Sequence, residues 1–226
     1  MRLMIGLFVT AALVSSLTAA DAKFPPPESM TKMIVRLMGP GIKPKSFPAL
    51  PKTIYRAGPH YARIEDPPDA RQQIHKLTII AEPDAYSVNL IDKKGTHAID
   101  QGNAHDLHLP VVLPFDPKHQ LGKLDQLEFG DEEDFFKEAG ATPEAGPSIN
   151  AKPTDALRLK LPTGSALLIL RAGTHEPVFL SWQTKEGTYK YEYIEYKDVS
   201  FDPKLFTKPA GITYKEILPD KGSEVG

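Results

Sequence analysis

Apolar and polar residues alternate with a period of two along most of the chain from residue 53 onward. In a β-strand this alternation places successive side chains on opposite faces, and Gly and Pro mark the turns between strands. The pattern therefore predicts an antiparallel meander. Its clearest segments are TIYRAGPHYARIE, HKLTIIAE and AYSVNLID in the first half, and DALRLKLP, SALLILRAG, PVFLSWQT and TYKYEYIEY in the second.

The second group of segments also indicates which side chains share a face. Leu157, Leu159 and Leu161 fall on one face of their strand, and Arg158 and Lys160 fall on the other. The next segment, SALLILRAG, is apolar on both faces, which is typical of a central strand. We therefore expect an apolar sheet face that begins with these leucines.

The segment SMTKMIVRLM, residues 29–38, has helical spacing instead. Its apolar residues recur at i, i+3, i+4, i+7 and i+8, Ser29 suits an N-cap, and Gly39-Pro40-Gly41 would end the helix. We expect an amphipathic helix whose apolar face packs on the sheet as a lid. That face consists of Met30, Met33, Ile34, Leu37 and Met38.

Residues 100–155 break the rhythm of strands. They are rich in proline, glycine and acidic residues, and they contain one short amphipathic segment, DEEDFFKEAG, whose leading acids suit a helix N-terminus. We expect a long irregular excursion with one short helix. Loops of this length in a compact domain usually have a functional role.

Near the end, the segment YKDVSFDPKLFTKPAGITY predicts a corner. Asp202 can cap a tight helical turn with Pro203 at its first position, and Leu205 and Phe206 would pack down onto the sheet. After Pro209 reverses the chain, ITYKEI adds a last strand. Together with the meander, this predicts an α+β fold. It consists of one strongly curved antiparallel sheet of about nine or ten strands, closed or half closed, with helices packed on the concave face.

The first 22 residues have the pattern of a cleavable signal peptide. Arg2 precedes an apolar run from Leu3 to Val14, and Ala20-Asp21-Ala22 fits the cleavage rule, with cleavage after Ala22. The run is shorter than the roughly 20 residues that a membrane helix needs. We expect a single domain over residues 23–226 that is periplasmic or secreted and has no transmembrane segment.

Composition removes several classes of function. The net charge of −2 among 226 residues gives no basic surface for nucleic acid. The chain has no cysteine, which excludes a thiol nucleophile and thiolate metal ligands. None of its asparagines begins an N-glycosylation site, which for an exported chain favours a bacterial source. Its 22 prolines, about twice the usual share of roughly 5%, favour strands and turns over long helices.

The sequence contains one cluster that could carry chemistry, HAIDQGNAHDLH. Imidazole and carboxylate groups can bind zinc, but the spacing matches no standard motif. The weak metal candidates are His97, His105 and His108, which we interpret as solvated loop residues. No nucleophile elbow or phosphate-binding glycine loop occurs, and the acids of GDEED suit a helix cap. We expect no cofactor and no catalysis.

The C-terminal corner resembles the signature of the LolA/LppX-like group of exported proteins, which handle lipids or lipoproteins. The resemblance covers residues 155–217 most clearly and implies a half-barrel with a helical lid over an apolar cavity that encloses acyl chains. The residues that carry it are Val199, Phe201, Asp202, Pro203, Leu205, Phe206, Pro209 and Gly211.

We therefore expect a non-catalytic binding or carrier protein for a lipid, a lipoprotein acyl chain or another apolar ligand. The alternative is a structural or protein-interaction domain of the cell envelope with a filled core, in which Trp182 and the tyrosines could form a surface for a protein partner. The candidate ligand-binding residues are the lid residues Met30, Met33, Ile34, Leu37 and Met38, and the sheet residues Leu157, Leu159, Leu161, Val178, Leu180 and Trp182.

Overall fold

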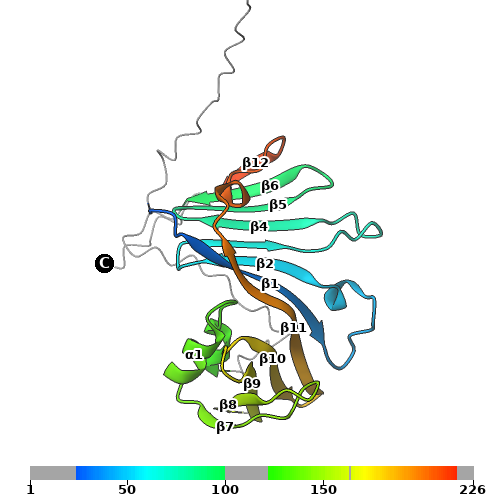
Figure 1. Cartoon of the computed structure of the whole chain (residues 1–226). Coiled ribbons are helices and arrows are strands. Elements are labelled where there is room, and N and C mark those ends of the chain that lie inside the picture. The colour runs from blue at the N-terminus through cyan, green and yellow to red at the C-terminus, as the bar shows by residue number, and fades with distance from the viewer. Residues whose placement is uncertain (1–23, 100–121, 163, 218–226) are drawn as a thin grey trace, which may run out of the picture.

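A computed structural model of the protein describes residues 24–99, 122–162 and 164–217. These residues form one twelve-stranded sheet in the order β12-β6-β5-β4-β3-β2-β1-β11-β10-β9-β8-β7 (Figure 1). The strands are β1 Ser29–Met38, β2 Lys52–Ala57, β3 Tyr61–Glu65, β4 Lys76–Ala81, β5 Asp84–Asn89, β6 Lys94–Ile99, β7 Thr142–Ala145, β8 Thr154–Leu161, β9 Gly164–Arg171, β10 Pro177–Thr184, β11 Gly187–Ser200 and β12 Thr213–Ile217.

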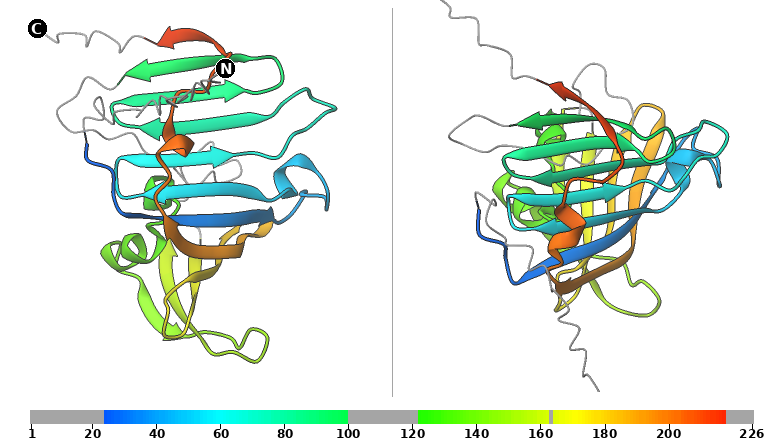
Figure 2. Two further views of the ribbon diagram at one scale, coloured as in Figure 1. Left: turned by 45° about the horizontal axis from the view of Figure 1, so that its top comes forward. Right: turned by 90° about the horizontal axis from the view of Figure 1, so that it is seen from above.

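The sheet is large, curved and open, as the half-barrel prediction requires. Neighbouring strands pair antiparallel, except that β12 pairs parallel with β6. β1 and β11 join the two halves, because β1 pairs with β2 on one side and with β11 on the other. β12 and β7 are the two edges, so the sheet does not close on itself (Figure 2).

The predicted helix over residues 29–38 is wrong, since this segment is strand β1. Both of its edges are paired, and Met33 lies opposite Ile54 on one side and Tyr196 on the other. Apolar residues at 33, 35 and 37 alternate with charged ones at 32 and 36, so the segment also satisfies a period of two. Pairing with a strand more than 150 residues away overrides the local helical spacing.

Pleating gives the sheet two faces, and each is buried in a different half. The Trp182 face carries Met33, Ile54, Leu180 and Trp182, and the Tyr61 face carries Met30, Tyr61, Ile79 and Tyr86. The buried residues of these faces form two separate clusters. We call them the Trp182 cluster and the Tyr61 cluster.

The predicted C-terminal corner is confirmed and covers the Tyr61 cluster. The 3-10 helix η3, Pro203–Phe206, begins after Asp202, whose carboxylate accepts a hydrogen bond of 3.0 Å from the backbone N–H of Lys204. Phe206 is buried, and Leu205 packs against the same cluster. In the left view of Figure 2, η3 lies over the front of the sheet.

Part of the 100–155 excursion is ordered structure. Residues 100–121 lie outside the described part, and the remainder contains the 3-10 helix η2, Gly122–Gln126, the helix α1, Glu132–Glu138, and the edge strand β7. The predicted short helix is therefore confirmed as α1, and β7 is an addition to the prediction. A further 3-10 helix, η1, spans Phe47–Ala49. No helix among the described residues is long and apolar enough to cross a membrane.

Candidate ligand site

The Trp182 face forms a continuous apolar surface across four strands. Leu180 of β10 lies opposite Tyr191 of β11 on one side and Leu168 of β9 on the other, and Leu168 in turn lies opposite Leu157 of β8. All four residues are at most 9% exposed. Trp182 extends this surface along β10, opposite Ala166 and Tyr189.

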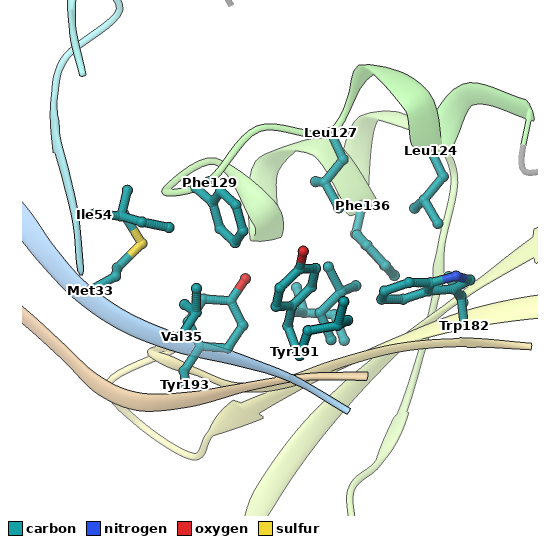
Figure 3. Packing of buried hydrophobic residues seen from close by; sticks show 14 of the residues in the cluster. Met33, Val35, Ile54, Leu124, Leu127, Phe129, Phe136, Trp182, Tyr191 and Tyr193 are labelled. Atoms are coloured by element: carbon teal, nitrogen blue, oxygen red, sulfur yellow. The ribbon is translucent and has the colours of Figure 1, made fainter. Parts of the chain in front are cut away.

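The segment of residues 122–141 covers this surface. Its side chains Leu124, Leu127, Phe129 and Phe136 are 0–1% exposed and belong to the Trp182 cluster. Figure 3 shows these four side chains facing Tyr193, Tyr191 and Trp182 of the sheet. A helix of seven residues such as α1 is not stable alone, so its structure depends on this apolar contact.

A carboxylate is buried where the cover meets the sheet. Glu132, the first residue of α1, is 1% exposed. Its Oε1 accepts hydrogen bonds from the Tyr193 hydroxyl at 2.6 Å and from the Gly130 backbone N–H at 3.0 Å. Its Oε2 has no hydrogen-bond partner among the described residues. Burial raises the pKa of Glu132 above its ordinary value, although the two hydrogen bonds oppose that rise.

The hydroxyl and indole groups of the sheet share this apolar setting. Burial raises the pKa of Tyr193 well above its ordinary value, and the neighbouring Glu132 carboxylate raises it further. Burial likewise raises the pKa of Tyr191. The Trp182 indole N–H has no hydrogen-bond acceptor among the described residues. The site thus combines a large apolar area with a few polar atoms, which is typical of small-molecule sites.

One ion pair and one histidine–carboxylate contact hold the cover at its margins. The Arg56 guanidinium of β2 lies 2.5 Å from the Glu128 carboxylate. On the other side, His175 Nδ1 in the β9–β10 turn lies 2.8 Å from Glu133 Oε1 of α1. The cover is therefore attached through polar side chains at its edges, while its centre is held by apolar packing.

The structure separates the predicted ligand residues into two groups. One group lies in or against the Trp182 cluster and consists of Met33, Leu37, Leu157, Leu159, Leu161, Leu180 and Trp182. Met30 lies in the Tyr61 cluster instead. Ile34 and Met38 are partly buried on the Tyr61 face of β1, and Val178 is partly buried at an irregularity in β10.

Several residues of the site escaped the sequence analysis. The motif DEEDFFKEAG contained a usable signal for Phe136, because an aromatic pair in an amphipathic helix must bury one face. Tyr191 and Tyr193 alternate with charged residues and so could be placed on one strand face, but not against Glu132. Leu124, Leu127 and Phe129 lie in irregular or single-turn backbone, which has no periodic pattern.

His97, one of the three weak metal candidates, lies between two carboxylates on the sheet. It is buried on β6, with Nε2 2.6 Å from Asp84 Oδ1 and Nδ1 2.6 Å from Glu216 Oε2. Its ring also stacks on Tyr86, with centroids 4.6 Å apart. The other candidates, His105 and His108, lie outside the described residues. Within the described ranges, no group of three His, Cys, Asp or Glu side chains is arranged to hold a metal ion.

The fold and site together define an open, curved sheet whose apolar face is covered by a segment of the same chain. No family model matches the sequence, and no curated protein sequence matches it. A conserved uncharacterised protein from Thermus thermophilus has a similar structure, with a TM-score of 0.50 and 9% identity over 83% of this chain and 90% of that one. This likeness shows the fold.

Other solved structures match with lower TM-scores. A LolA superfamily protein from Nitrosomonas europaea has a TM-score of 0.34 and 12% identity over 83% of this chain and 93% of that one. An outer membrane lipoprotein-sorting protein domain from Vibrio parahaemolyticus has a TM-score of 0.32 and 7% identity over 76% and 85%.

Proposed function

We propose that the protein is a non-catalytic binding protein that holds a lipid, a lipoprotein acyl chain or another apolar ligand against the Trp182 face. The observation that carries the proposal is the construction of that site. A continuous apolar surface over β8–β11 is covered by a short segment whose helix depends on the sheet for its stability. Such a cover can be displaced at a lower cost than a strand of the sheet.

In this proposal the Trp182 face is the concave side of a half-barrel, and residues 122–141 form its lid. The ligand takes the place of Phe129 and Phe136, and the unpaired Oε2 of Glu132 and the Trp182 indole N–H become available to its polar end. Residues 1–22 direct export, and the mature domain acts in the periplasm. The C-terminal signature, quoted above, supports this reading.

A second candidate function follows from the same packing. The four covering side chains are almost fully buried, as in a completed core. On this view the domain holds no ligand and acts as a structural or interaction domain of the cell envelope. The two candidates differ in one observable, which is occupancy of the Trp182 face.

Trp182 is the sole tryptophan of the chain, and it reports that occupancy directly. Mature protein would first be purified natively from its periplasm and extracted with organic solvent for mass spectrometry. Delipidated protein would then be titrated with phospholipid that carries brominated acyl chains, because bromine quenches tryptophan on close contact. We expect a stoichiometric lipid in the extract and saturable quenching of Trp182.

Two matched variants locate the site. Phe136→Ala removes a ring from the cover of the Trp182 face, and Phe206→Ala removes the same ring from the Tyr61 cluster. We expect Phe136→Ala to change the lipid affinity by about tenfold or more, a difference of about 1.4 kcal/mol, and folded Phe206→Ala to bind as wild type. An extract without lipid, together with unquenched Trp182, would favour the filled-core candidate.

A further inference from the structure

A second concave site lies on the Tyr61 face of β10 and β11, on the opposite side of the sheet from the Trp182 cluster. It is a groove of about 830 Å³. Its floor includes Val178, Phe179 and Ile194, and its walls are the Ile149–Thr154 loop and the β9–β10 turn. Ile194 is 48% exposed, so an apolar side chain faces solvent in this groove.

Two neighbouring strand irregularities create the floor. In β10, Pro177 pairs with Leu170 and Phe179 pairs with Ile169, so Val178 is an extra residue. In β11, Glu195 pairs with Ile34 of β1 and Tyr193 pairs with the next residue, Val35, so Ile194 is an extra residue as well. Bulges re-aim side chains and recur beside functional sites. Here each bulge adds one aliphatic side chain to the same groove.

Both walls hold strained backbone conformations. Asn150 and Ala151 have φ of 50° and 61°, and His175 has φ of 59°, although none of them is glycine. The first loop is closed by paired backbone hydrogen bonds of 3.0 Å between Ile149 and Lys152. Its base is fixed where the Thr154 hydroxyl donates to the Pro147 carbonyl at 2.5 Å. Of these three residues, Asn150 lines the groove, and Ala151 and His175 lie next to it in the chain; backbone strain of this kind is often found at ligand sites.

The charges of the groove favour an acidic group. Its two carboxylates are already paired, with Arg36 Nε 3.0 Å from Glu192 Oε2 and Arg171 Nε 3.1 Å from Glu176 Oε2. Lys152, also at the rim, is exposed and has no carboxylate partner in the described part of the chain. The Lys190 ammonium lies outside the lining, 4.7 Å from the centre of the Phe179 ring. An anion at this rim would be attracted by cations that outnumber the carboxylates.

We propose that this groove binds a single-chain amphiphile with one acidic head group, such as a fatty acid. The alkyl chain lies on Val178, Phe179 and Ile194, and the carboxylate pairs with Lys152 at the rim. This site is distinct from the Trp182 cluster, because the floor residues lie on the opposite face of the sheet, although Tyr193 of that cluster also borders the groove. A positive result here neither requires nor establishes a ligand under the lid.

The test uses the full mature protein and decanoate below its micellar concentration, with binding measured by calorimetry. Ile194→Asp places a carboxylate on the floor, and its matched control is Ile217→Asp, at a residue of nearly equal exposure on β12. Lys152→Gln removes the free cation, and its control is Lys185→Gln in the exposed β10–β11 turn. Decyltrimethylammonium has the same chain with the opposite charge.

We expect decanoate to bind with a stoichiometry of one. Ile194→Asp should lower the affinity for decanoate at least about tenfold, and Lys152→Gln should lower it about threefold or more. Both control variants should bind decanoate with the affinity of the wild type. The cationic amphiphile should not bind. Brominated decanoate should not quench Trp182, since this indole lies on the other face and four residues, about 13 Å, along β10 from Val178.

Four results with decanoate and its cationic analogue would overturn the proposal. They are no binding of decanoate, equal losses in the test and control variants, binding of decyltrimethylammonium as tight as that of decanoate, or quenching of Trp182 at a total stoichiometry of one. The last result would move the fatty acid under the lid and so would support the proposed function instead. Ile194 and Lys152 are exposed, so circular dichroism should show that both variants are folded. Binding of an extended acidic peptide in place of decanoate would overturn the assignment of a fatty acid as the occupant.

Discussion

The two buried clusters of this sheet differ in what covers them. The Tyr61 cluster is covered by η3, which follows β11 directly, and its contacts are aromatic. The rings of Phe201 and Phe206 stack with their centroids 5.1 Å apart. The Tyr61 ring meets both of them edge-on, with centroid distances of 5.3 Å to Phe201 and 5.5 Å to Phe206. The Trp182 cluster is covered by residues 122–141, which are distant in sequence from β10 and β11 and bring the buried carboxylate of Glu132 with them.

Under the proposed function, this difference separates a cluster that stabilises the fold from a cluster that holds a ligand. Aromatic packing without a buried carboxylate, as among Tyr61, Phe201 and Phe206, stabilises the fold without need of a further partner. A carboxylate with one unpaired oxygen inside an apolar cluster reduces stability, and such groups are commonly retained for function. Under the proposed function, the two buried clusters of one sheet serve two purposes, and β1 and β11 contribute to both.

The largest expected effect comes from removing a central ring from either cluster. Trp182→Ala and Phe206→Ala should each lower the free energy of unfolding by about 3–5 kcal/mol, because both rings are at most 5% exposed. Urea unfolding followed by circular dichroism measures this directly. Ile217→Ala, at an exposed residue, should change it by less than about 0.5 kcal/mol. A loss below about 1 kcal/mol in one ring variant only would show that its cluster is not part of the cooperative core.

A change of pH should affect the Trp182 cluster in particular. Because burial raises the pKa of Glu132, its ionised form destabilises the folded state at pH values above the ordinary glutamate pKa of 4.5. Wild type should therefore gain stability, relative to Glu132→Gln, as the pH falls from 7 towards 5. The expected change in the difference is on the order of 1 kcal/mol.

Thermal unfolding of the two proteins across this pH range measures the difference, and Glu138→Gln at the exposed end of α1 is the control. Other carboxylates titrate in both proteins and cancel in the comparison. If the stability of wild type relative to Glu132→Gln is constant with pH, or if it falls at low pH, the result would contradict a buried ionised carboxylate.

A smaller effect is expected at the edge of the Tyr61 face. Glu216→Gln weakens the contact of 2.6 Å with His97 that ties β12 to β6, but Glu216 is about half exposed. The cost should be about 0.5–1 kcal/mol. Hydrogen exchange should show faster exchange in β12, with unchanged protection in β9 and β10. Equal acceleration in all strands would mean that β12 does not open separately.

The sequence predicted those parts of the fold that depend on neighbouring residues. The hairpins, the short helix α1 and the Asp202-Pro203 corner are set by turn residues, caps and alternation within a few positions. The same local signals placed Leu157, Leu159 and Leu161 on one face of β8. For the candidate site, these local signals were enough to predict many of the residues that the sheet contributes.

The errors arose where distant segments decide the structure. Residues 29–38 satisfy both a helical and a strand period, and the choice depends on pairing with β11. The parallel pairing of β12 with β6 and the placement of Glu132 against Tyr193 are likewise long-range contacts. Val178 and Ile194 sit at bulges, which shift the alternation by one residue and so defeat any assignment of faces by counting.

The smallest effect tests the independence of the two clusters within a single strand. Met30 and Met33 both lie on β1, but Met30 belongs to the Tyr61 cluster and Met33 to the Trp182 cluster. Each substitution by alanine should cost about 2–5 kcal/mol. Because the side chains point to opposite faces, their coupling in a double-mutant cycle should be below about 0.5 kcal/mol. Met33→Ala and Ile54→Ala, which face each other across β1 and β2, provide the comparison and should couple more strongly. A large coupling between Met30 and Met33 would mean that β1 transmits strain between the faces, and a ligand under the lid would then also be sensed at the C-terminal corner.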